Sequence, residues 1–118
     1  MNYHAHVYFE LSQTPTAEAV LAMARLKPEL MRVYGLVNRK VGPHAKPMFE
    51  IHFHEQNKKS VLEWLDQNRQ GLSVLVHQDS GDDIKDHTDH VLWLGEKLPI
   101  DFGFFDLVMR DPSKLIHK

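Results

Sequence analysis

Two segments of this chain alternate between apolar and polar side chains, and this alternation limits its fold more than any other feature. They are HAHVYFEL at residues 4–11 and MFEIHFH at residues 48–54. Because successive side chains of a strand point to opposite faces of a sheet, each segment is predicted to be a strand with one apolar face. The other faces carry polar residues: His4, His6 and Tyr8 on the first strand, and Glu50, His52 and His54 on the second. The pattern predicts a sheet with one histidine-lined face.

The segments around these two strands complete an order of elements. A helix is expected after residue 13, where Pro15 suits a first helical turn. A second amphipathic helix is predicted over residues 57–70, with Gly71 placed to end it. Two further strands are predicted, at residues 32–41 and 72–77.

The predicted order is therefore β-α-β-β-α-β, which is the ferredoxin-like split β-α-β arrangement of the α+β class. In that topology a four-stranded antiparallel sheet has two helices on one face. Its first and third strands are central, and its fourth lies beside the first. Residues 78–118 form a C-terminal extension that is too apolar to be disordered, and it is expected to pack on the domain or on a partner subunit. Residues 1–118 are predicted to form a single domain.

Composition excludes several classes of function. The net charge of −2 over 118 residues gives no basic surface for nucleic acid and no polybasic patch for a membrane. No apolar run is long enough to span a bilayer, and no secretory signal is visible, so a cytoplasmic location is expected. The chain has nine histidines and no cysteine, which rules out disulfides, thiolate nucleophiles and thiolate metal sites.

The histidines suggest a metal site on the open face of the sheet. His6 lies on the predicted central strand and His77 at the end of the fourth strand, so both can reach one point. A third ligand would come from residues 44–52, where His44, His52 and Glu50 are the candidates. Three imidazoles, or two with a carboxylate, suit Fe(II), Zn(II), Mn or Cu.

Other residues have more ordinary interpretations. Trp64 and Trp93 lie in apolar runs and are expected in the core, and Ser73 is expected to be structural. The acidic loop DSGDDIKD lacks the spacing of a calcium-binding loop and is interpreted as a solvated turn. The remaining histidines are interpreted as solvated polar residues: His54, His90 and His117.

Four blocks of the chain, in order, resemble those of the DOPA 4,5-dioxygenase family. They are YHAHVYF at 3–9, VGPHAKPMFE at 41–50, LSVLVHQDSGDDIKDH at 72–87 and VLWLGEKLPID at 91–101. The resemblance implies a ferredoxin-like fold and extradiol cleavage of a catechol such as DOPA by O2. Fe(II) is the metal that it implies, with Zn(II) or another divalent ion possible in the purified protein. The chain departs from the family pattern at two positions, because Gln78 and Ala45 stand where the family has proline after a histidine.

The resemblance also implies roles for particular residues. It places the family's characteristic histidines at His6, His44, His77 and His87. His6, His44 and His77 would hold the metal, with Glu50 as the carboxylate alternative. His87 or His4 would accept and return the catechol proton, and Tyr8 would hydrogen-bond the substrate or bound oxygen.

Two expectations concern assembly and a competing function. The open sheet face and the apolar segment 102–105 would both leave surface exposed that a second subunit could bury, so a homodimer is expected. The competing function is a dimeric module that binds a metal or a small aromatic molecule without turnover, because a fold and a ligand set do not determine a reaction.

Overall fold

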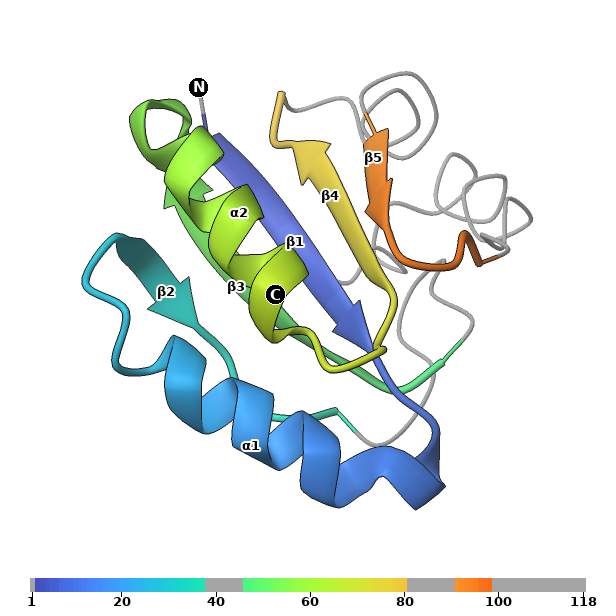
Figure 1. Ribbon diagram of the computed structural model, residues 1–118. Helices are drawn as coiled ribbons and strands as arrows, with labels where there is room; N and C mark the ends of the chain where they lie inside the picture. The colour runs from blue at the N-terminus through green and yellow to red at the C-terminus, as the bar shows by residue number, and fades with distance from the viewer. Residues whose placement is uncertain (1, 38–45, 81–90, 99–118) are drawn as a thin grey trace, which may run out of the picture.

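The computed structural model describes residues 2–37, 46–80 and 91–98, and in this part of the chain the strands form one antiparallel sheet of five (Figure 1). The strand order is β2-β3-β1-β4-β5. The strands are β1 (Asn2–Tyr8), β2 (Leu30–Val33), β3 (Met48–His54), β4 (Val74–Gln78) and β5 (Val91–Leu94). The helices are α1 (Thr14–Ala24) and α2 (Lys58–Asn68), each preceded by a short 3-10 turn, η1 (Leu11–Gln13) and η2 (Glu55–Asn57).

This arrangement confirms the predicted α+β ferredoxin-like fold. The first and third strands, β1 and β3, pair at the centre, and β4 lies on the other side of β1. The prediction of four strands was one short, because β5 pairs with β4 and extends the sheet. Its four residues lie within the segment that was interpreted only as an apolar extension. The single domain predicted for residues 1–118 stays a prediction, since its last segment is outside the described residues.

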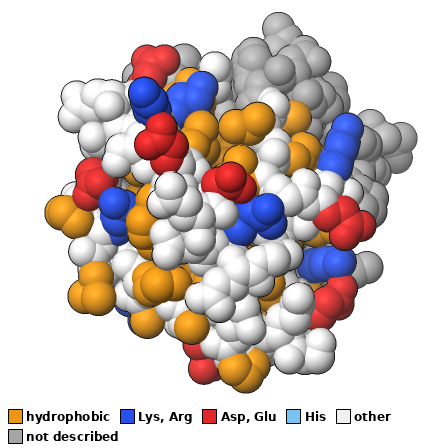
Figure 2. All heavy atoms as spheres, in the orientation of Figure 1, with side chains coloured by type: hydrophobic (Ala, Val, Ile, Leu, Met, Phe, Trp, Pro, Cys, Tyr) orange, Lys and Arg blue, Asp and Glu red, His pale blue; other side chains and the backbone are white. Residues whose placement is uncertain are grey.

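The main core lies between the sheet and the two helices, which share one side of it (Figure 1). The apolar members of the alternating strands point into it, as the alternation predicts: Ala5, Val7, Phe49, Ile51 and Phe53. The helices contribute Val20 and Leu21 from α1 and Val61 and Leu65 from α2. On the outer surface of this layer, basic and acidic side chains are interspersed (Figure 2). In the described residues neither helix has the length and apolar run that a membrane crossing needs.

Local chemistry sets where the elements end. Pro15 stands in the first turn of α1, as predicted. The first strand was expected over residues 4–11, but it ends at Tyr8. There the Glu10 backbone N–H donates to the Gln13 side-chain oxygen at 2.8 Å, and this capping contact turns the chain into η1. After α2 the backbone takes positive φ at Gln70 and at Gly71 (φ 51 and 82), which closes the helix.

The strand predicted over residues 32–41 is displaced. Pairing with β3 covers only Leu30–Val33, with a register shift between Leu30 and Arg32, and a single bridge joins Val37 to Met48 farther along. Gly35 interrupts the segment RVYGLVN, and this segment has no strict alternation from which its register could be located. The fourth strand is also shifted, to Val74–Gln78.

The face opposite the helices is not bare. A second, smaller apolar cluster lies there, made by Tyr8, Met48, Leu75 and Leu98, with Trp93 packed against it. Both tryptophans therefore pack as predicted, Trp64 against the main core and Trp93 against this cluster. The same face carries three almost fully buried polar side chains: His6, Glu50 and His77.

Candidate metal centre

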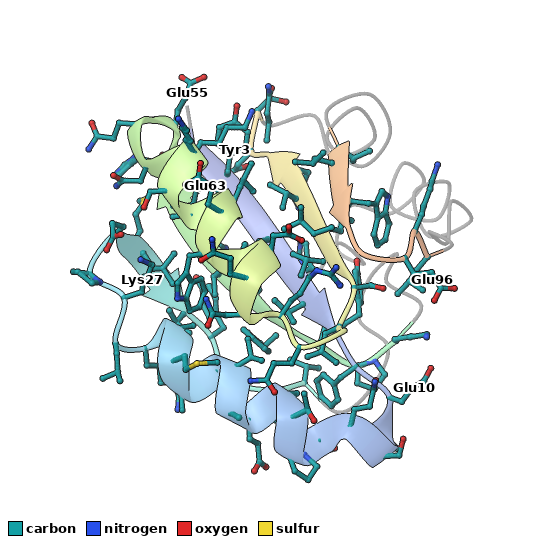
Figure 3. The ribbon with its side chains drawn as sticks, viewed as in Figure 1. Tyr3, Glu10, Lys27, Glu55, Glu63 and Glu96 are labelled. Carbon is teal, nitrogen blue, oxygen red and sulfur yellow. The ribbon has the colours of Figure 1, made fainter. Side chains whose placement is uncertain are left out.

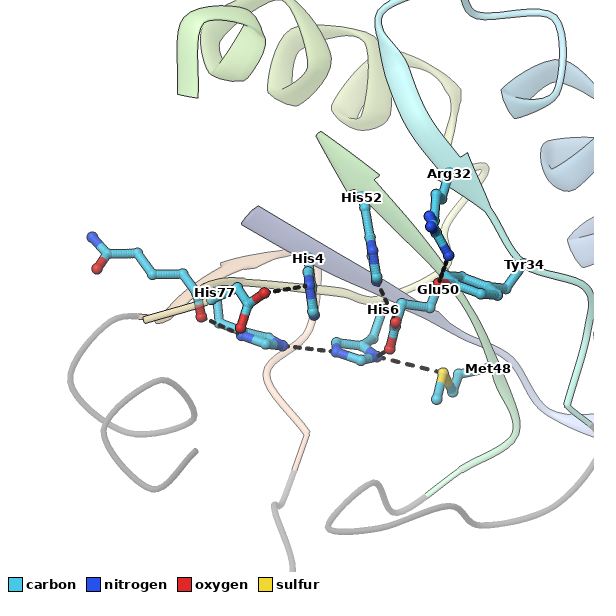
Figure 4. A network of polar contacts seen from close by, with 10 residues as sticks. His4, His6, Arg32, Tyr34, Met48, Glu50, His52 and His77 are labelled. Carbon is cyan, nitrogen blue, oxygen red and sulfur yellow. Dashed lines mark hydrogen bonds and ion pairs between the residues drawn. The ribbon is translucent and has the colours of Figure 1, made fainter. Parts of the chain in front are cut away.

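Strand register brings polar side chains into two adjacent rows on the helix-free face. The first row crosses β4, β1 and β3 through His77, His4 and His52. In the second row His6 is opposite Glu50. Side chains opposite each other on paired strands lie about 4.5–5.5 Å apart at Cβ, so the rows form one contiguous group. We call these five residues the histidine cluster (Figure 4).

The contact at the centre of the cluster joins two imidazoles. His6 Nε2 lies 2.8 Å from His77 Nε2, and the two residues are only 3% and 4% exposed. The other nitrogen of each ring faces acceptors. His77 Nδ1 donates to the Gln78 carbonyl at 2.8 Å, while His6 Nδ1 faces Glu50 Oε1 at 3.2 Å and Met48 Sδ at 3.5 Å.

These partners determine which nitrogens carry protons. In a neutral imidazole one nitrogen carries the proton and the other has a lone pair. With the proton of each neutral ring on Nδ1, which faces a carbonyl in His77 and a carboxylate in His6, the Nε2 lone pairs of the two rings face each other. Two lone pairs at this distance repel unless a proton or a metal cation lies between them. The pair therefore has the donor chemistry of a metal site.

His4 adds a third imidazole to this point. The nearest ligand atoms of His4, His6 and His77 all lie within 4.8 Å of one another. The His4 ring also stacks on His52, with centroids 3.7 Å apart and planes at 3°. His4 Nε2 lies 3.3 Å from the Asp79 carboxylate, which fixes the ring from its other side.

A second group shares His4 but has different chemistry. Its ligand atoms, from His4, Glu50 and His52, also lie within 4.8 Å of one another. Here His52 Nε2 donates to Glu50 Oε2 at 2.5 Å, which is a complete donor–acceptor contact. In the first group two imidazole nitrogens, His6 Nε2 and His77 Nε2, face each other at 2.8 Å, so the donor set of His4, His6 and His77 fits a metal better.

Three imidazoles and no thiolate suit Fe(II), Zn(II), Cu(II) and other divalent first-row ions, and they leave coordination positions for a substrate. The residues present therefore fit a metal, and they do not determine which one. The Glu50 carboxylate next to these ligands already contacts two imidazoles, those of His6 and His52. The proposed ligand atoms among the described residues are therefore imidazole nitrogens.

Several of the residues predicted from sequence come together here. His6, His77 and Glu50, predicted as ligands, lie in the cluster, as does His4, predicted for proton transfer. His44 and His87 lie outside the described residues, so their predicted roles stay predictions. His54 is exposed, as interpreted.

Sequence reasoning missed Asp79. It was counted with the solvated acidic loop, yet its carboxylate pairs with His4 and its backbone N–H donates to the Asn2 carbonyl at 2.9 Å. Its place directly after β4, one residue beyond Gln78, was the signal that could have identified it.

Tyr8 lies beyond the cluster along β1, between His6 and Trp93 of β5. Its ring stacks near His6 at 6.4 Å and near Trp93 at 5.8 Å between centroids. Burial raises the pKa of Tyr8 far above its ordinary value, and the charge of Glu50 raises it further. The hydroxyl therefore keeps its proton at neutral pH and acts as a hydrogen-bond donor.

Tyr8 also lines a polar hollow of about 230 Å³ at this end of the molecule. Glu10 and Glu96 line it from two different segments (Figure 3). Lys46 lies in the same wall, with its Nζ 2.6 Å from Glu10 Oε1. Tyr8 thus borders both the histidine cluster and a hollow lined by charged side chains.

Comparison with known proteins agrees with this fold. The model of the Dopa 4,5-dioxygenase family matches residues 3–104. A crystal structure of a protein from Nostoc punctiforme, described as a candidate dioxygenase, superposes with a TM-score of 0.85 at 33% identity and covers 91% of this chain and 92% of that one.

Two curated sequences are similar over 86% of the chain. One is an uncharacterised 21.2 kDa protein from Botryotinia fuckeliana, 31% identical over 112 residues. The other is a DOPA 4,5-dioxygenase from Amanita muscaria, 27% identical over 109 residues. The matches cover 61% and 48% of these two relatives, so the chain spans about half the length of the curated relatives that it matches. The match to the family model over most of the chain shows that it belongs to the Dopa 4,5-dioxygenase family.

Proposed function

We propose that this protein is a metal-dependent extradiol dioxygenase that opens the ring of a catechol with O2, with Fe(II) as its metal. The observation that carries the proposal is the pair of Nε2 atoms of His6 and His77, 2.8 Å apart with both Nδ1 atoms directed at acceptors. Family membership supplies the reaction class, since the Amanita muscaria relative is named a DOPA 4,5-dioxygenase.

His6, His77 and His4 would hold the metal, with His44 as a further candidate from the family resemblance. When bound, the metal would orient catechol and O2 together and stabilise the negative charge that develops on the ring oxygens. The reaction adds both oxygen atoms of O2 across one ring carbon–carbon bond, so one catechol and one O2 give one ring-opened semialdehyde.

The chain's own residues would prepare the substrate. Burial of His6 and His77 keeps bulk water from the ligands. Tyr8 retains its proton and would donate a hydrogen bond to a substrate oxygen. Removal of the catechol proton needs a base, and His87 remains the residue proposed for it.

The test is single-turnover and steady-state catalysis by protein loaded with Fe(II) without oxygen. After addition of L-DOPA and O2, the yellow semialdehyde should form with one O2 consumed per catechol. His77→Ala should abolish both signals, whereas His54→Gln, on the same sheet but exposed, should retain them.

A contrary outcome would favour the binding module. If the wild-type protein binds metal stoichiometrically but consumes no O2 with a range of catechols, the dioxygenase proposal fails. Retention of ring cleavage by His77→Ala would instead show that the metal is held elsewhere.

A further inference from the structure

Both oxygens of one buried carboxylate face imidazole nitrogens. Glu50 Oε1 lies 3.2 Å from His6 Nδ1, and Glu50 Oε2 lies 2.5 Å from His52 Nε2 (Figure 4). Glu50 is 97% buried. A carboxylate in such surroundings is costly unless donors satisfy its oxygens, and here the two rings supply them.

We infer that Glu50 and His52 are positioning residues for the metal ligand His6, rather than ligands themselves. The inference rests on the proposed function in one respect, because it takes His6 as a ligand. With Oε1 at 3.2 Å from His6 Nδ1, the negative charge of Glu50 favours a proton on that nitrogen and so the lone pair of His6 on Nε2, the atom that faces His77. A carboxylate behind a ligating histidine fixes its tautomer and ring orientation and increases its basicity.

His52 holds the carboxylate in turn. Its ring lies flat against His4, 3.7 Å away at 3°, and meets the Tyr34 ring edge-on at 5.0 Å. Because rings on two sides limit its rotation, His52 presents its Nε2–H to Glu50 in one orientation. Register provides the geometry: Glu50 and His52 are two residues apart on β3, and their partners on β1 are His6 and His4.

A second metal ion between Glu50 and His52 is the competing explanation for the same group. A cation there would replace the proton that His52 shares with Glu50, although this donor and acceptor already satisfy each other. A proton between carboxylate and imidazole accounts for the distance directly. The geometry therefore favours one metal per chain.

The first test follows metal binding with Co(II), whose visible spectrum reports its ligands, and with Fe(II). Glu50→Gln should weaken affinity by about 10–100-fold while leaving one metal per chain and the Co(II) spectrum unchanged in type. His52→Gln keeps a side-chain donor and should weaken affinity less than His52→Leu, which removes it. The matched control, His54→Gln on the same strand, should bind as the wild type does.

Two outcomes of this test would overturn the inference. A Co(II) spectrum of different type in Glu50→Gln, or a second metal in the wild type that Glu50→Gln removes, would make Glu50 a ligand. Unchanged affinity in both Glu50→Gln and His52→Leu would show that the pair does not act on His6.

The second test needs no metal and no activity. Nitrogen NMR of the metal-free protein should show a proton on Nδ1 of His6 and on Nε2 of His52, and Glu50→Leu should alter both signals. If either nitrogen lacks its proton in the wild type, the inference fails. If those protons are present but the protein binds no divalent metal, the pairing stands and the proposed function fails, so the two failures are distinguishable.

Discussion

At the scale of single residues, the burial of Tyr8 makes the stability of the fold depend on pH. Its ring is 98% buried between the histidine cluster and Trp93, and burial raises its pKa above the ordinary 10.0. In the unfolded chain the same hydroxyl ionises near its ordinary value. Above that value the unfolded state has lost this proton and the folded state has kept it.

The free energy of unfolding should therefore fall as the pH rises above about 10, by at most about 1.4 kcal/mol per pH unit from this group. Below that pH Tyr8 contributes no pH dependence. Denaturant unfolding at several alkaline pH values measures the effect, and Tyr8→Phe should remove this part of the slope. Equal slopes in wild type and Tyr8→Phe would contradict the assigned shift.

The residues of the site were only partly accessible from sequence. His6, His77 and Glu50 could be proposed because the alternation of β1 and β3 and the apolar run before His77 place them on one face. The Glu50–His52 contact and the His4–His52 stack depend on register, which pairs His4 with His52, and no pattern within one strand contains that information.

At the scale of elements, α2 is held to the sheet by a narrow apolar stripe. Val61 and Leu65 are its buried residues, and Leu65 is in the main core. Leu65→Ala should lower the free energy of unfolding by about 2–5 kcal/mol, because it leaves a cavity under the helix. Leu11→Ala, at a side chain that is 62% exposed, should change it by no more than about 0.5 kcal/mol. Thermal or denaturant unfolding measures both, and equal losses would contradict the assigned packing.

The end of β5 meets the end of α2 at Gly95. Gly95 has φ +77, and a Cβ there would lie 2.5 Å from Arg69 Nη1, the atom that donates to the Leu72 carbonyl. Gly71 also has positive φ, at +82, but nothing lies within 4 Å of its would-be Cβ.

Both Gly95→Ala and Gly71→Ala should cost about 1–2 kcal/mol of stability from the left-handed backbone. Gly95→Ala should cost more, because Arg69 must also move and lose its hydrogen bond. Unfolding curves of the two variants give the difference. A smaller loss in Gly95→Ala than in Gly71→Ala would contradict this reading of the junction.

Strands with strong alternation of apolar and polar residues were predicted accurately, whereas strands without it were not. The predicted strand at 48–54 has the observed bounds, because apolar and polar residues alternate from Phe49 to His54. In weakly patterned segments the predicted bounds were wrong. There the strand positions depend on backbone contacts with distant residues, such as the Val37–Met48 bridge. The strand β5 was missed because four residues, Val91–Leu94, form too short an apolar run to separate from a packed tail.

At the scale of the whole molecule, the fold gathers residues from distant parts of the chain. His6 and His77 are 71 positions apart, and the pairing of β1 with β4 brings them together. The homodimer expected from sequence stays a proposal, and light scattering of the purified protein measures it directly. A dimer mass would support it, and a monomer at all concentrations would contradict it.

The most direct test of the metal centre is equilibrium binding of Fe(II) without oxygen to wild type, His77→Ala and His54→Gln. Wild type and His54→Gln should each bind one ion per chain with equal affinity. In His77→Ala the affinity for Fe(II) should fall by more than about 100-fold, the upper end of the effect expected for a positioning residue. The reason is that this variant removes one of the two facing Nε2 atoms. Binding by His77→Ala as tight as by wild type would contradict the assignment of His6 and His77 as metal ligands.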